Sequence, residues 1–160
     1  HSDDESQKEI NWLIDLIQEI RSARSEVNIP ASLKINLKIV SLNKQFFQCF
    51  KNNEIIIKRL ARVGSIEQEI LIQSGSINIS IPGIECFIPL ENLIDISKEK
   101  SRLDKTYKKL KSEQIMLNNK LKNKSFLEKA PKDVVDKIRK RSSILVTEID
   151  TKLKAIDRLN

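Results

Sequence analysis

The sequence predicts an α+β protein that ends in a long antiparallel coiled-coil hairpin of two helices. Three patterns predict this fold class: helical spacing of apolar residues at the start, strict alternation in the middle, and seven-residue repeats in the last part of the chain. We expect an N-terminal helix within 1–30, a small sheet-plus-helices subdomain in 31–89, and the paired helices in 90–160.

The first region is predicted to be an amphipathic helix over 6–27, stopped by Asn28 and Pro30. Trp12 and Leu16 lie partly off its main apolar face, so the apolar surface is wider than one partner requires. We infer that this is the last helix of a bundle whose other members are missing. The spacing of three and four positions that predicts the helix is seen at Ile10, Leu13, Ile14, Ile17 and Ile20.

The middle region alternates apolar and polar residues, as strands with one solvated face do. Pro82-Gly83 stands between two such runs and predicts a β-hairpin. Two short helical stretches, one around Phe46–Phe50 and one over about 54–62, are expected to cover one face of the sheet. The strands are expected at 33–41, 66–73, 76–81 and 84–88.

The last region has apolar residues at every seventh position, which predicts two helices packed as a coiled coil. The first helix is expected from about 90 to 123, and Pro131 suits the first turn of the returning helix. A one-turn capping box is expected at Ser125–Glu128. The repeats run through Ile96, Leu103, Leu110 and Leu117, and then through Val135, Ile149 and Ile156.

Charge is distributed very unevenly along the chain. Residues 98–160 hold 19 basic and 9 acidic side chains, whereas 63–97 hold five acidic side chains and no Lys or Arg. The large excess of positive charge in 98–160 indicates a polyanionic partner. Tyr107 falls on the seam, so no aromatic faces outward and recognition is expected through phosphates and shape. The heptad register predicts that six basic residues face away from the partner helix: Lys98, Arg102, Lys105, Lys108, Lys109 and Lys122.

Composition argues against catalysis by this chain. Its three glycines are isolated, which excludes a P-loop and a dinucleotide fingerprint. The only histidine is His1, so histidine-based catalysis and histidine-ligated metals are excluded, and no metal site is expected. Cys49 and Cys86 fit neither a disulfide framework nor a zinc pattern, and are expected to be small core residues. No signal sequence or membrane span is seen, so a cytoplasmic protein is expected.

Three segments carry a family likeness. The segment 20–30 contains Ile20-Arg21 and Arg24-Ser25-Glu26-Val27-Asn28-Ile29-Pro30, and the later one contains Lys120-Leu121, Lys129-Ala130-Pro131 and Val134-Val135. Between them, Leu90-Glu91-Asn92-Leu93-Ile94-Asp95 leads into the coiled coil. Together these segments resemble the C-terminal end of bacterial valyl-tRNA synthetases, over nearly the whole chain.

The resemblance implies a fragment of an ATP-dependent valine–tRNA ligase that lacks the catalytic and anticodon-binding parts. The helix in 1–30 would then end an anticodon-binding-type bundle, and 90–160 would be a tRNA-binding arm that leans on the outer corner of the tRNA. The fragment itself would hold no cofactor, while the parent enzyme would use ATP and Mg. Arg21 and Arg24 match the family pattern. They are expected either to bind nucleic acid or to serve the helix end structurally.

Two functions remain open at this point. The first is a tRNA-binding module that supports attachment of valine to its tRNA. The second is a coiled-coil protein-interaction or spacer module without RNA binding, because heptad hairpins are generic and lysines often only solvate them. The outward basic groups favour the first, since a spacer would more often mix Glu with Lys at these positions.

Overall fold

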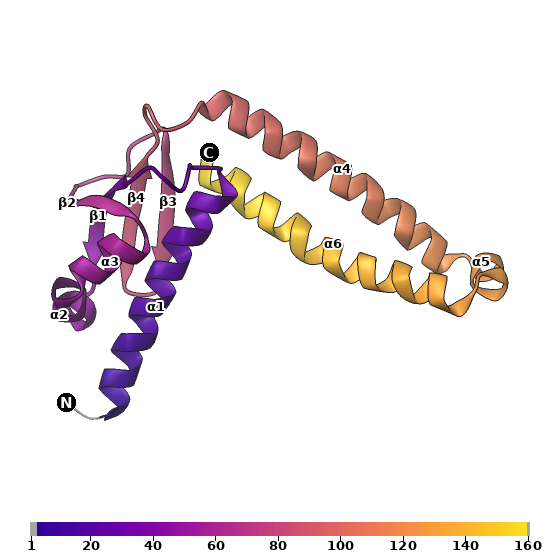
Figure 1. Ribbon diagram of the computed structural model, residues 1–160, viewed down its shortest axis with the longest axis horizontal. Helices are drawn as coiled ribbons and strands as arrows, with labels where there is room; N and C mark the ends of the chain where they lie inside the picture. The colour runs from indigo at the N-terminus through magenta and orange to yellow at the C-terminus, as the bar shows by residue number, and fades with distance from the viewer. Residues whose placement is uncertain (1–2, 160) are drawn as a thin grey trace. The chain divides into compact units, whose positions relative to one another are not determined.

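The computed structural model describes residues 3–159, and His1 lies outside them. The chain divides into two compact units. The body comprises the described residues up to Glu99 together with Arg158 and Leu159, and the helical hairpin comprises Lys100–Asp157. The predicted α+β class is confirmed (Figure 1). In chain order the elements are α1 (Asp3–Glu26), β1 (Ile35–Leu42), α2 (Lys44–Asn52), α3 (Glu54–Leu60), β2 (Val63–Gln68), β3 (Ser76–Ile81), β4 (Ile84–Pro89), α4 (Ile96–Lys122), α5 (Lys124–Lys129) and α6 (Lys132–Leu159).

The body is built on a four-stranded sheet in the order β2-β1-β4-β3. β1 pairs in parallel with β2 and antiparallel with β4, and β3 and β4 form the predicted β-hairpin. The register places Ile39 opposite Cys86, and Cys86 opposite Ile79. Residues opposite each other share a face, so these buried side chains form one apolar layer across three strands.

Three helices cover this sheet. α1 packs against β3 and α2, and α3 packs against β2. Trp12, Leu16 and Ile20 of α1 are buried, whereas Ile10 and Ile14 keep 51% and 45% of their surface exposed. The helix was therefore predicted correctly, but the side that it turns toward the sheet includes the residues expected to lie off the main face.

One predicted strand is misplaced. The run Ile70-Leu71-Ile72 was expected within a strand over 66–73, but β2 ends at Gln68. Ile70 and Leu71 are 88% and 75% exposed. The parallel partner sets the position instead, because Ile35 and Leu37 of β1 pair with Val63 and Ile66.

The turn of the β-hairpin is held by an aromatic pair. The ring of Trp12 stacks on that of Phe46, with centroids 4.6 Å apart and planes inclined by 2°. The indole Nε1 of Trp12 donates to the carbonyl of Pro82 over 2.8 Å. Gly83 has φ +96°, and a Cβ on it would lie 2.5 Å from Cδ2 of Phe46. The turn thus requires a residue without a side chain at Gly83.

Arg158, in the last turn of α6, contacts α1 and β3 within the body. Its Nε donates to Oε2 of Glu26 over 2.8 Å, and its Nη1 donates to the carbonyl of Asn78 over 3.1 Å. Its Nη2 also pairs with Glu19. The side chain of Arg158 is only 11% exposed, so these bonds are largely sheltered from water.

The helical hairpin contains all but the first residues of α4 and the last two of α6, which run antiparallel and are linked through α5 (Figure 1). Leu117, Leu145 and Ile149 form its buried centre, and three half-buried residues pack against them: Tyr107, Leu110 and Ile138. α4 starts at Ile96 rather than near 90, because Asp95 caps it by accepting from the backbone N of Lys98 over 3.0 Å.

The link between the long helices differs slightly from the expected capping box. Asn123, rather than Ser125, caps α5, since its Oδ1 accepts from the backbone N of Phe126 over 3.2 Å. The carbonyl of Pro131 accepts the first backbone bonds of α6. Within residues 3–159, no helix combines the length and the apolar character needed to cross a membrane.

Candidate nucleic-acid interface

The six cations that the heptad register turned outward are all exposed. Arg102, Lys105 and Lys109 follow one another at intervals of three and four residues, so they share one side of α4. The buried Leu103 and Leu117 and the half-buried Leu110 belong to the opposite side. Lys98 precedes this row by one turn of the same helix. The row of three spans about 10 Å at about 1.5 Å per residue.

The other two predicted cations lie off this row. Lys108 pairs with Asp104, with Nζ 2.9 Å from Oδ2, while its side chain stays 73% exposed. Lys122 is exposed in the last turn of α4. Beside it, Nζ of Lys120 lies 6.0 Å from the ring centre of Phe126, an exposed cation–π geometry.

Two carboxylates of the helical hairpin are bound to a cation between the helices. Arg141 donates through Nε and Nη2 to both oxygens of Glu113, over 2.8 and 3.0 Å. Its Nη1 donates to Glu148 over 3.3 Å. The bonds from Arg141 hold the pKa of Glu113 below its usual value and raise the pKa of Arg141. Arg141 thus binds both Glu113 and Glu148, and the charge of Lys109, in the row on α4, also lowers the pKa of Glu113.

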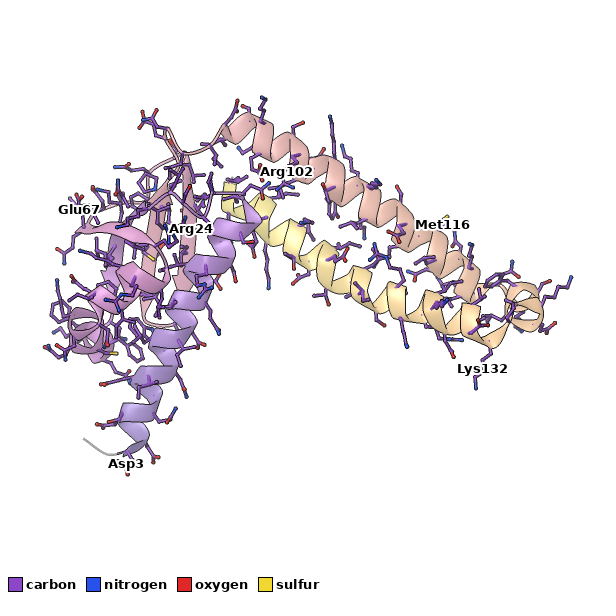
Figure 2. All side chains as sticks on the ribbon, in the orientation of Figure 1. Asp3, Arg24, Glu67, Arg102, Met116 and Lys132 are labelled. Carbon is purple, nitrogen blue, oxygen red and sulfur yellow. The ribbon has the colours of Figure 1, made fainter. Side chains whose placement is uncertain are left out.

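Polar residues also occur within the predicted seam. Ser142 donates to the side chain of Asn118 over 3.2 Å and so links α6 to α4. Tyr107 is half-buried in the apolar cluster, as predicted from its seam position. Beyond Lys109, the outward side of α4 carries Met116, which is 52% exposed and points away from α6 (Figure 2). The interhelical bond of Arg141 was not anticipated from the sequence, although opposite charges beside a heptad seam are a known signal.

Of the two roles predicted for Arg24, its contacts are those of the structural role, since it donates hydrogen bonds to the backbone. Its side chain lies at the end of α1 in the body, and the residue is only 6% exposed (Figure 2). Its Nη1 donates to the carbonyls of Ala61 and Arg62 over 3.1 and 2.8 Å. Its Nη2 donates to the carbonyls of Pro30, over 3.0 Å, and Leu33. Both terminal nitrogens of the Arg24 guanidinium are bound to backbone carbonyls, so its contacts in this structure are those of the structural role.

Arg21 is exposed one turn before Arg24 on α1. It lines a cavity of the body together with Arg59 and Arg62, two cations that sequence reasoning did not select. They come from segments far apart in the sequence, and no local pattern connects them with Arg21.

Comparison with known proteins gives a consistent result. Residues 95–160 match the family described as the valyl tRNA synthetase tRNA binding arm. The chain is 39% identical over 139 residues to a valine–tRNA ligase of Cereibacter sphaeroides, which covers 87% of this chain and 14% of that protein. It is 34% identical over 158 residues to the one of Agrobacterium fabrum, and 35% identical over 160 residues to the one of Rhizobium meliloti. These two matches cover 99% and 100% of this chain but 17% of each relative.

Proposed function

Since residues 95–160 belong to the valyl-tRNA synthetase tRNA-binding-arm family and the chain corresponds to a C-terminal part of valine–tRNA ligases, we propose that its helical hairpin binds tRNA. The observation that carries the proposal is the exposed row of Arg102, Lys105 and Lys109 along one side of α4. Such a row meets the phosphates of a folded RNA, whose charge density dominates affinity for basic surfaces.

The mode of binding follows from what the hairpin offers. Its residues 100–157 contain 17 Lys and Arg against 8 Asp and Glu. Tyr107 is packed inward, so the outward side supplies cations and not a stacking platform. Recognition therefore depends on phosphates and on shape, with little reading of base sequence. The apolar cluster around Leu117, Leu145 and Ile149 holds the two helices together, and the Arg141–Glu113 pair links them further, so the cations are presented on a paired-helix support.

In a whole ligase this part would raise the affinity for tRNA and orient it, while valine attachment takes place elsewhere. The parts that bind ATP and Mg and read the anticodon would be supplied by the rest of such a protein, in the cytoplasm. The acidic side chains of the stretch 63–97, which begin at Glu67 and have no Lys or Arg among them, would repel phosphates from the part of the body that carries them.

A second function is favoured by one observation, the exposed apolar side chains on both long helices. Ile115 is 58% and Val146 is 59% exposed. A protein-interaction module would use such residues, and it would bind a protein partner without appreciable affinity for tRNA. Isolated exposed apolar residues are common, however, so the row of cations outweighs them.

The test is a filter-binding titration of unfractionated tRNA at low and high salt with the Lys105→Glu, Lys109→Glu double variant. We expect weaker binding and a log–log salt slope that is lower by about 0.7–0.9 for each phosphate that the variant no longer neutralises. The matched control is Lys137→Glu, Lys140→Glu, which makes the same change of charge at exposed positions of α6. If both variants bound tRNA equally weakly, the loss would be a general effect of net charge and not of the row on α4. Unchanged affinity at low salt would refute the proposal.

A further inference from the structure

Two adjoining cavities of the body are lined by cations. One, of about 400 Å³, lies between the end of α1 and the end of α3, and the other, of about 380 Å³, lies between α3 and the start of β2. Arg59 and Arg62 line both cavities. The first also contains Arg21, and the second also contains Lys34 and Lys58. We call these five residues the body cation cluster.

The linings of these two cavities contain no Asp or Glu. Other hollows of the body differ in this respect. The cavity beside β1 and β2 is lined by three carboxylates, Glu54, Glu67 and Glu69, with Lys51. The one beside α1 and Pro82 is lined by Asp15 and Glu19 with Lys8. The two cavities around the turn between α3 and β2 are thus lined by cations alone among their charged residues, whereas the other two have an excess of carboxylates.

The ion pairs found within residues 3–159 leave the body cation cluster out. Glu54 pairs with Lys51, and Glu26 and Glu19 pair with Arg158. Glu67 forms an ion pair with Lys38, which does not belong to the cluster. Arg21, Arg59 and Arg62 are exposed. Their charges therefore remain available to an anion from solution.

The fold holds this cluster in place through Arg24. Arg62 adopts φ +53°, and its carbonyl accepts from Nη1 of Arg24 and from the backbone N of Ile35. The same guanidinium binds the carbonyls of Pro30 and Leu33, just before Lys34. One buried side chain thus ties α1, the 30–34 segment and the α3–β2 turn together, and these are the segments that carry the cluster.

Gly64 lines the second cavity beside Lys34. A Cβ on Gly64 would lie 3.4 Å from Cβ of Lys34, at the limit of ordinary contact. A longer side chain at position 64 would therefore meet the side chain of Lys34, which lines the same cavity. The burial of Arg24 beneath the cluster adds a further positive charge, and its pKa is lowered first by burial and then by the nearby Arg62.

We propose that the body cation cluster is a second phosphate-binding surface, which binds the sugar–phosphate backbone of RNA. Arg59 and Arg62, which line both cavities, would each contact one of two neighbouring phosphates. Arginine suits this role because its planar fork binds phosphate oxygens in pairs. The proposal rests on the proposed function, since it gives the same RNA a second binding surface on the other unit of the chain. Arg24 acts here as a positioning residue.

The test uses the whole chain and unfractionated tRNA, with the Arg21→Gln, Arg59→Gln double variant. Both residues are exposed helical positions, so the fold should persist, which the melting temperature checks. The control is Lys8→Gln, Lys44→Gln, which removes two exposed charges elsewhere on the body. We expect roughly tenfold weaker binding and a lower salt slope for the first variant, and little change for the control. In a separate arm, inorganic phosphate is titrated at constant ionic strength while the arginine Nε–H resonances are followed.

The outcomes separate the two proposals. If Arg21→Gln, Arg59→Gln binds tRNA as the control does, the second surface is refuted while the hairpin proposal stands. If this variant weakens binding and Lys105→Glu, Lys109→Glu does not, the second surface is supported and the hairpin proposal fails. If phosphate alone saturates the resonances at concentrations where tRNA does not shift them, the cluster is a small-anion site and the RNA assignment is overturned. Absence of tRNA binding by the unmodified chain overturns both proposals.

Discussion

Arg141 of α6 donates to both carboxylate oxygens of Glu113 of α4, over 2.8 and 3.0 Å, so one planar pair joins the two long helices. Both side chains are partly exposed, at 39% and 32%, which limits the strength of the pair. It nevertheless fixes the alignment of the helices, because a bidentate geometry is satisfied in only one register.

This pair predicts a dependence of hairpin stability on pH. The bond from Arg141 lowers the pKa of Glu113, so the ionised carboxylate stabilises the fold above the ordinary glutamate pKa of about 4.3, and this contribution is lost as pH falls through the lowered value. Glu113→Gln should therefore lower the melting temperature at about pH 7 and make little difference at about pH 2.5. Circular dichroism melts would measure this. The control is Asp150→Asn, which breaks a pair within α6 only. A gap between wild type and Glu113→Gln that is the same at both pH values would contradict the assignment.

Arg24→Met should destabilise the body strongly. The change leaves four backbone carbonyls without their donor, and unsatisfied buried groups cost about 1–3 kcal/mol each before relaxation, so we expect a destabilisation of roughly 2–5 kcal/mol. Urea unfolding followed by the fluorescence of Trp12, the only tryptophan, reports this unit. Arg21→Met, one turn earlier and exposed, should stay within about 0.5 kcal/mol of wild type. Similar destabilisation by the two variants would contradict the structural role of Arg24.

Gly83→Ala should destabilise the β-hairpin. The residue has φ +96°, and the new methyl group would lie 2.5 Å from the ring of Phe46, so we expect a destabilisation of about 2–4 kcal/mol from strain and overlap. Gly64→Ala is the matched control, because its nearest atom would be at the ordinary distance of 3.4 Å. The same fluorescence titration compares them. If Gly64→Ala were the more harmful change, the clash at the turn would not be the cause.

The two cysteines should differ in reactivity. Burial, with help from Glu85, raises the pKa of Cys86 to about 12. Burial first and Glu9 second also raise the pKa of Cys49, although this residue lies nearer the surface. Both therefore remain protonated at about pH 8, and alkylation by iodoacetamide, followed by mass spectrometry, should be slow and should modify Cys49 before Cys86. Rapid labelling of Cys86 in the folded protein would contradict its burial.

The features that the sequence predicts well are those set by neighbouring residues. The β3–β4 pair depends on Pro82-Gly83 and the alternation on either side of it, and the outward row on α4 depends on helical periodicity alone. β2 depends on a distant partner, since its register comes from parallel pairing with β1 and Gly64 and Ser65 interrupt its alternation. The nearby Ile70-Leu71-Ile72 looked more like a strand, yet no strand of the sheet pairs with it.

The candidate site shows the same limit. Arg21 and Arg24 lie three positions apart and match the family pattern equally well. Only the fold reveals that the carbonyls of Ala61 and Arg62 arrive beneath Arg24 and engage it, while Arg21 stays at the surface. Spacing along a helix cannot predict which carbonyls from distant parts of the sequence will accept hydrogen bonds from one of its side chains.

Arg158 is separated from Glu26 by 132 positions, and every residue of the helical hairpin lies between them. During synthesis on the ribosome the two glutamates of α1 emerge early, and their cation emerges only after the hairpin has been translated. Closing so long a loop is entropically costly and belongs to the late stages of assembly. A nascent chain released before position 158 would leave Glu19 and Glu26 without this counterion. The contacts of the body can therefore be completed only after the hairpin has been synthesised.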